Sequence, residues 1–136
     1  MITIQELLFN RGLDINWRAK LVRHKDNRRD LYNLYRTDRV GFLAYQNSQS
    51  KDVFNDVDYI VSFIGEEGLL SRFIGVYKLT GRKQLSDDHF EYQMEEVKEQ
   101  FDDLIERVII KWRNAISWHQ WINNKMEIIE IHPGLH

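Results

Sequence analysis

The sequence contains no cysteine and only one proline, Pro133. Without cysteine, disulfides, thiolate metal sites and redox chemistry through sulfur are excluded. No segment approaches the roughly 18 consecutive apolar residues of a membrane-spanning helix. The first six residues also lack the basic start and apolar core of a secretory signal. We therefore expect a cytoplasmic protein without membrane contact, linkers or low-complexity tracts.

The remaining composition is that of a folded protein. Of the 136 residues, 43% are hydrophobic and 12% are aromatic, which is typical of a globular chain with its own core. This length is close to the commonest domain size. We expect residues 1–136 to form a single domain.

Charge is distributed unevenly along the chain, although the net charge is only -2. Residues 1–50 contain nine Lys or Arg against five Asp or Glu, whereas residues 51–106 contain six against fourteen. Residues 107–136 contain four against two. Basic ends around an acidic middle are compatible with one positive face, so nucleic acid remains a candidate partner. The same numbers argue against a strongly basic, non-specific binder.

The first third of the chain predicts helices. Thr3 is a helix-capping residue before Ile4, Leu7 and Leu8, which share one helical face, and Gly12 is placed to end the helix. A short strand is expected over 19–22, followed by a polar turn. The segment from about 30 to 46 then predicts a helix or an irregular segment.

From residue 58 onward the pattern changes to short strands. The β-branched and aromatic run 59–64, the turn 65–68 and the run 72–79 predict a hairpin. Further strands are expected over 92–97, 107–112 and 126–131. So many short strands favour an α+β fold, with a small curved sheet or β-barrel of about five to six strands and N-terminal helices.

A basic run is the first feature that indicates a ligand. Seven side chains that can carry positive charge occur within twelve residues: Arg18, Lys20, Arg23, His24, Lys25, Arg28 and Arg29. Arginine and lysine contact phosphates without reading base sequence. A solvated turn, with Asp26 and Asp30 as ion-pair partners, is the alternative interpretation.

Aromatic and amide side chains provide candidates for contact with a base. Tyr45 precedes three amides in the segment Tyr45-Gln46-Asn47-Ser48-Gln49, and amides can hydrogen-bond a base edge. Three of the four tryptophans, Trp112, Trp118 and Trp121, lie within ten residues. We expect Trp112 in the core. Strand alternation would place Trp118 with Gln120 on one face and His119 with Trp121 on the other, where each tryptophan either fills the core or lines a pocket.

Catalytic and metal-binding patterns are weak. Asp88, Glu96 and Lys98 form an acidic and Glu-x-Lys arrangement like that of magnesium-dependent restriction nucleases, but this pattern is common in charged chains and a solvated acidic face explains it better. No serine, histidine and aspartate stand in a recognisable triad context, and the histidines lack zinc-ligand spacing. We expect no metal, no cofactor and no catalytic residue.

Four segments, in this order, carry a family resemblance: Lys20-Leu21-Val22-Arg23-His24-Lys25-Asp26, Tyr45-Gln46-Asn47-Ser48-Gln49, Phe73-Ile74-Gly75-Val76-Tyr77 and Arg107-Val108-Ile109-Ile110-Lys111-Trp112. Together they resemble the N-terminal region that precedes the nuclease domain in bacterial GIY-YIG nuclease family proteins. The match extends over residues 20–131. The nuclease motif itself is not present, because Phe63-Ile64-Gly65 and Gly75-Val76-Tyr77 occur in the reverse of the required order.

The resemblance implies a PUA-like, DNA-related accessory module of a restriction-type system, with a nuclease domain in cis or in trans. We expect a non-catalytic module that binds DNA through a modified or flipped base. Its candidate contact residues are Arg23, His24, Lys25, Arg28, Arg29, Tyr45, Gln46, Gln49, Trp118, Gln120 and Trp121. Two alternatives remain: a magnesium-dependent nuclease that uses Asp88, Glu96 and Lys98, and a protein-interaction domain without a nucleic-acid role.

Overall fold

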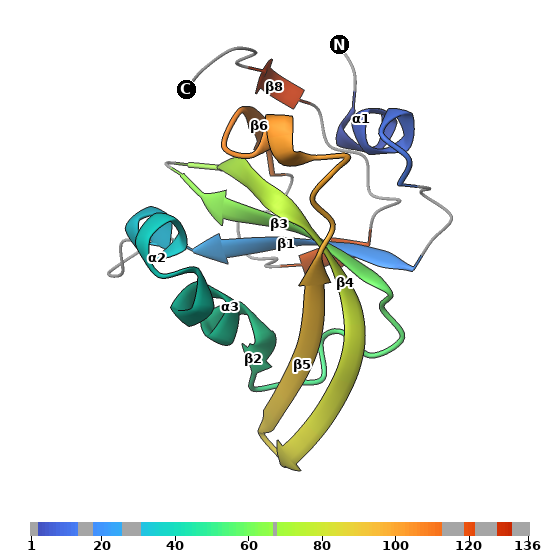
Figure 1. Ribbon diagram of the computed structural model, residues 1–136, viewed down its shortest axis with the longest axis vertical. Helices are drawn as coiled ribbons and strands as arrows, with labels where there is room; N and C mark the ends of the chain where they lie inside the picture. The colour runs from blue at the N-terminus through green and yellow to red at the C-terminus, as the bar shows by residue number, and fades with distance from the viewer. Residues whose placement is uncertain are drawn as a thin grey trace.

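A computed structural model describes residues 3–13, 18–25, 31–66, 68–112, 119–121 and 128–131. Three helices occur in the first 47 residues, and strands dominate the rest of the chain (Figure 1). The elements are α1 (Ile4–Asn10), β1 (Ala19–Lys25), α2 (Leu31–Thr37), α3 (Arg39–Asn47), β2 (Ser48–Gln49), β3 (Tyr59–Gly65), β4 (Leu70–Ser86), β5 (His89–Glu96), a 3-10 turn η1 (Asp102–Leu104), β6 (Val108–Lys111), β7 (His119–Trp121) and β8 (Ile128–Ile131).

Capping residues determine where the helices begin and end. The hydroxyl of Thr3 accepts a hydrogen bond from the Glu6 amide at 3.2 Å, and Gly12 follows α1 with a positive φ of 99°, as the sequence predicted. The expected single segment over 30–46 is two helices. Asp38 separates them, because its carboxylate accepts from the Gly41 amide at 3.0 Å and starts α3 as a new helix.

The sheet confirms the expected α+β class. Its main path has the order β2-β5-β4-β3-β1-β7, with β6 added to β4 and β8 added to β6. Figure 1 shows a strongly curved sheet, and the pairs in the described part of the chain leave its main path open, with β2 and β7 at the two ends. The predicted hairpin of β3 and β4 is present. One pairing was not predicted from the sequence: β1 lies parallel to β3. The end of β1 and the start of β3 are separated by 33 residues.

Strand β4 is longer than the sequence indicated. It extends to Ser86 and pairs with β5 past two register shifts, which adds a two-stranded arm (Figure 1). From Arg82 to Asp88 every side chain of this arm is exposed. Such a solvated ribbon provides sites for control substitutions distant from the rest of the sheet.

Apolar side chains fill both faces of the central strands. On one face, α1 packs with Phe63 and the fully buried Trp112, whose ring centroids are 6.0 Å apart. On the other face, Tyr35 of α2 and Phe42 of α3 pack against Ile64. The expected core position of Trp112 is therefore confirmed. In the described residues, none of the helices combines the length and apolarity needed to cross a membrane.

Candidate nucleic-acid interface

The end of β1, which is part of the basic run, lies beside the end of β3 at one end of the sheet. Because β1 and β3 are parallel, their last residues, Lys25 and Gly65, are register partners, and both arrows point toward α2 (Figure 1). We call this the β1–β3 end; it comprises Arg23, His24, Lys25, Gly65 and the turn 66–70.

The strand register brings the flanks of two further segments to the β1–β3 end. The Trp112 amide donates to the Leu69 carbonyl at 2.6 Å, and His119 of β7 is the register partner of Val22. Trp112 and His119, the described residues on either side of 113–118, are thus both near this end. Segment 26–30, which contains Arg28 and Arg29, starts after Lys25 and ends before Leu31, which packs with Ile64.

Arg23 is buried at this end and binds the turn between β3 and β4. Its exposed fraction is only 8%, and Nε donates to the Ser71 hydroxyl at 2.8 Å. Nη2 donates to the carbonyls of Glu66, Gly68 and Leu70 at 3.2, 3.1 and 3.5 Å. Burial lowers the pKa of Arg23, but an arginine side chain stays protonated in proteins. The guanidinium is therefore an immobilised charge, unlike the solvated phosphate contact expected from the sequence.

Gly65 leaves room for this guanidinium. A Cβ atom at Gly65 would lie 2.7 Å from Cζ of Arg23 and 2.8 Å from its Nε, far closer than atoms in van der Waals contact. The side chain of Arg23 therefore crosses over Gly65, and a side chain at this position would displace the hydrogen-bonded guanidinium. This close approach explains a glycine at the last residue of β3.

His24 points to the opposite face and is a neutral, buried residue. Its Nε2 lies 2.9 Å from Oε1 of Gln46, and because an amide oxygen only accepts, Nε2 carries the proton. Burial lowers the pKa of His24 to about 4, with the Gln46 hydrogen bond acting in the opposite direction. A neutral imidazole does not supply the positive charge that the basic run predicted at this position.

The segment 45–49 contacts this histidine from α3. Gln46 is fully buried, and its Oε1 also accepts from the Ser62 hydroxyl at 2.6 Å. Tyr45 is half-buried with its ring centroid 5.6 Å from that of His24, and Gln49 donates to the Gln46 carbonyl at 2.9 Å. Both acceptor sites of the Gln46 oxygen are occupied within the protein. Gln46 therefore has a structural role here rather than the base-contacting position expected.

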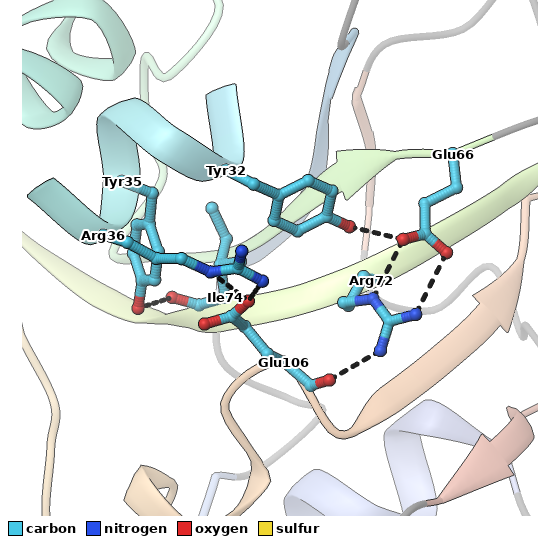
Figure 2. Close-up of polar contacts among 7 residues, drawn as sticks. All are labelled: Tyr32, Tyr35, Arg36, Glu66, Arg72, Ile74 and Glu106. Atoms are coloured by element: carbon cyan, nitrogen blue, oxygen red, sulfur yellow. Dashed lines mark hydrogen bonds and ion pairs between the residues drawn. The ribbon is translucent and has the colours of Figure 1, made fainter. Parts of the chain in front are cut away.

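Helix α2 is attached to the same end by hydrogen-bonded charges (Figure 2). The Tyr32 hydroxyl donates to Glu66 at 2.9 Å, and Arg72 donates to the same carboxylate at 2.9 Å. Arg72 also donates to the Glu106 carbonyl at 2.7 Å, while Arg36 pairs with the Glu106 carboxylate. These contacts hold the start of α2 against the β3–β4 turn.

Trp121 lies farther along the sheet. It is the register partner of Lys20 on β1, and the Lys20 ammonium lies 4.7 Å from the tryptophan ring centroid. The indole is 42% exposed, and Lys20 also donates to the Val53 carbonyl at 2.8 Å. Trp121 is thus an exposed aromatic with the Lys20 ammonium over its ring.

Some predicted contact residues lie outside the described residues. These are Arg28, Arg29 and Trp118 and the side chains of Lys25 and Gln120. Their predicted roles stay predictions.

The residues of the nuclease alternative are separated in the structure. Asp88 precedes β5 and accepts from Ser86 at 2.8 Å, whereas Glu96 ends β5 and pairs with Arg39 at 3.2 Å. A strand advances about 3.3 Å per residue, so the two residues lie roughly 25 Å apart along β5. Within the part of the chain that the structure describes, no group of three acidic or histidine side chains is placed to hold a metal ion.

Two of the four motifs that carry the family resemblance contact each other. His24 of the first motif binds Gln46 of the second. In the third motif, Gly75 has a positive φ of 131° at a β-bulge, and the Tyr77 hydroxyl donates to the Ile74 carbonyl at 3.3 Å. Sequence reasoning missed the partner Ser62. An isolated serine within the apolar run 59–64 was the available signal, because a buried hydroxyl requires a partner.

Comparison with family models, curated proteins and solved structures finds no match for this chain.

Proposed function

We propose that this protein is a non-catalytic DNA-binding module that contacts DNA at the β1–β3 end. In this model, Lys25, Arg28 and Arg29 contact backbone phosphates. Trp118 stacks on a modified or flipped base, and the amide of Gln120 is a candidate for its edge. Gln49 is on β2, at the other end of the strand order from β7, and is not part of this proposed contact. The module serves to direct a restriction-type nuclease that is present in cis or in trans.

The observation that carries this proposal is the strand register at the β1–β3 end. Parallel pairing of Lys25 with Gly65, together with His119 opposite Val22, brings Lys25 and His119, which adjoin segments 26–30 and 113–118 in the sequence, to the same end of the sheet. A cationic segment beside an aromatic one is the combination that single-stranded or extruded bases require, since phosphates need charge and bases need a stacking surface.

Charge pairing elsewhere supports the same location. Five arginines outside the basic run each form an ion pair with a carboxylate: Arg11, Arg36, Arg39, Arg72 and Arg82. Their charges are compensated within the protein. The separation of Asp88 from Glu96 also argues against the magnesium-dependent alternative.

The first experiment measures DNA binding by fluorescence anisotropy at several salt concentrations. Labelled duplexes contain unmodified cytosine, modified cytosine or a mismatch that eases base extrusion. We expect binding that weakens with salt, and tighter binding to a modified or mismatched duplex. Absence of salt-sensitive binding to every duplex would overturn the proposal. Cleavage of plasmid in the presence of Mg²⁺ would overturn its non-catalytic part.

Variants then locate the surface. R28A/R29A should lower the slope of log affinity against log salt by about 1.8, because each phosphate contact contributes about 0.9. Trp118→Ala should weaken binding by about 5- to 150-fold through lost stacking. Lys83→Ala, on the exposed β4–β5 arm, is the control and should leave the slope unchanged. An equal effect of all three variants would contradict the assigned surface.

A further inference from the structure

Arg23 differs in its partners from the described arginines that form ion pairs. Six of the described arginines form ion pairs with Asp or Glu: Arg11, Arg18, Arg36, Arg39, Arg72 and Arg82. Arg23 is more deeply buried than any of these six, yet within the described residues its partners are one hydroxyl and three carbonyls. Its positive charge therefore has no carboxylate to balance it there.

The positive charge of the Arg23 guanidinium is therefore only partly compensated by the described residues. Transfer of a charged group out of water is costly unless the charge is paired, and carbonyl dipoles offset only part of that cost. An anion near the guanidinium would supply the rest, with a stronger attraction than at a fully solvated position.

The hydrogen-bond pattern also leaves donors for such an anion. All four bonds of the guanidinium to described residues come from Nε and Nη2. Nη1 carries two N–H groups, and these donate to none of the described residues. Ser71 and the turn carbonyls fix the plane of the fork, so an incoming anion meets donors whose orientation is already set.

We propose that the Arg23 guanidinium is a preorganised anion subsite that binds one phosphate oxygen through Nη1. The chemical class of the ligand is a phosphodiester, and inorganic phosphate should occupy the same donors more weakly. That the phosphodiester belongs to DNA rests on the proposed function; the anion subsite itself does not. Arg23 thereby both holds the β3–β4 turn, through Nε and Nη2, and binds the ligand.

The test observes the arginine directly. Nitrogen-15 NMR follows the side-chain Nε–Hε signals of Arg23 and Arg82 in the wild-type protein while sodium phosphate replaces sodium chloride at constant ionic strength. Arg82 is the matched control, because its guanidinium is already paired with Asp52. We expect a saturable shift at Arg23 and none at Arg82. No shift at Arg23, or equal non-saturating shifts at both, would overturn the subsite.

A second titration uses a dinucleotide phosphodiester and then the labelled duplex. Saturation of the Arg23 signal at lower concentrations than with inorganic phosphate is expected. DNA binding without any Arg23 shift would overturn the subsite and leave the proposed function standing. A phosphate-induced shift without DNA binding would support the subsite and overturn the proposed function.

Substitution provides a check by a different readout. Arg23→Gln should lower the salt slope of DNA binding by about 0.9, the contribution of one phosphate contact. Arg82→Gln is the control and should not change it. An unchanged slope with folded Arg23→Gln would contradict the subsite. If the variant does not fold, the wild-type titrations decide the question, because they need no substitution.

Discussion

Arg23 and His24 are neighbours on β1, but their basic side chains are buried in different protonation states and with different partners. Arg23 is buried with its charge and is surrounded by a hydroxyl and carbonyls at the β3–β4 turn. His24 is buried on the other face without charge, and its partner is the neutral Gln46. Strand alternation separates them. Chemically similar residues in one motif can therefore have different roles, which depend on the face of the sheet that each one occupies.

The largest expected effect on stability concerns the face of the sheet on which His24 is neutral. Gln46→Leu leaves the His24 N–H and the Ser62 hydroxyl without their common acceptor, and each buried unsatisfied donor costs about 1 to 3 kcal/mol. We expect a loss of about 3 to 4 kcal/mol in the free energy of unfolding, measured by urea denaturation. Gln93→Leu, at an exposed position of β5, is the control. A loss below 1 kcal/mol would show that the buried network contributes little.

Acidification tests the protonation state of His24, on the same face of the sheet. The pKa of His24 is about 4 in the folded protein against 6.5 as the ordinary value, so the unfolded chain binds this proton first. The free energy of unfolding should therefore fall as pH drops below 6.5 and level off for this group near pH 4. Between pH 7 and pH 5 the expected loss is about 2 kcal/mol. His24→Gln should remove this loss, and an unchanged dependence in that variant would exclude His24 as its source.

Gly65→Ala tests the opposite face of the sheet, where the charged Arg23 is buried. The added Cβ would overlap the guanidinium of Arg23, which four hydrogen bonds hold in place. We expect a loss of about 2 kcal/mol, within the usual range for overpacking. Gly68→Asn is the comparison, since that position has a positive φ of 68° and open space around a Cβ. Equal destabilisation by both substitutions would argue against a specific clash with Arg23.

Two buried serines give the smallest and most direct comparison of the faces. Ser71 accepts from the charged Arg23 at 2.8 Å, and Ser62 donates to the neutral Gln46 at 2.6 Å. Hydrogen bonds to charged groups are stronger, so Ser71→Ala should cost about 2 kcal/mol and Ser62→Ala about 1 kcal/mol. Thermal and urea unfolding of the two variants check the order. The reverse order would mean that Arg23 does not depend on Ser71.

Local patterns predicted much of the secondary structure. Thr3 and Gly12 bound α1, and the run 59–64 with its turn specified the β3–β4 hairpin, because capping and turn chemistry act over a few residues. The division of the segment 30–46 was missed, since Asp38 is an ordinary surface residue until its carboxylate caps α3. The length of β4 was missed because its exposed half has no buried alternation.

The candidate site was predicted only as a set of residues. The basic run and the segment 45–49 were both identified, but their contact through His24 and Gln46 depends on the packing of α3 against β1. The burial of Arg23 depends on Ser71 and on a turn more than 40 residues away. Sequence spacing carries no information about such distant partners.

The amino-acid sequence by itself determined the α+β class, the cap of α1, the β3–β4 hairpin and the core position of Trp112, because hydrophobic periodicity and local hydrogen bonding decide these features. Only the tertiary structure decided which basic residues are charged, buried or exposed. That decision follows from the parallel pairing of β1 with β3. The pairing places Arg23 against turn carbonyls and His24 against an amide, and the surroundings of a group control the cost of its charge.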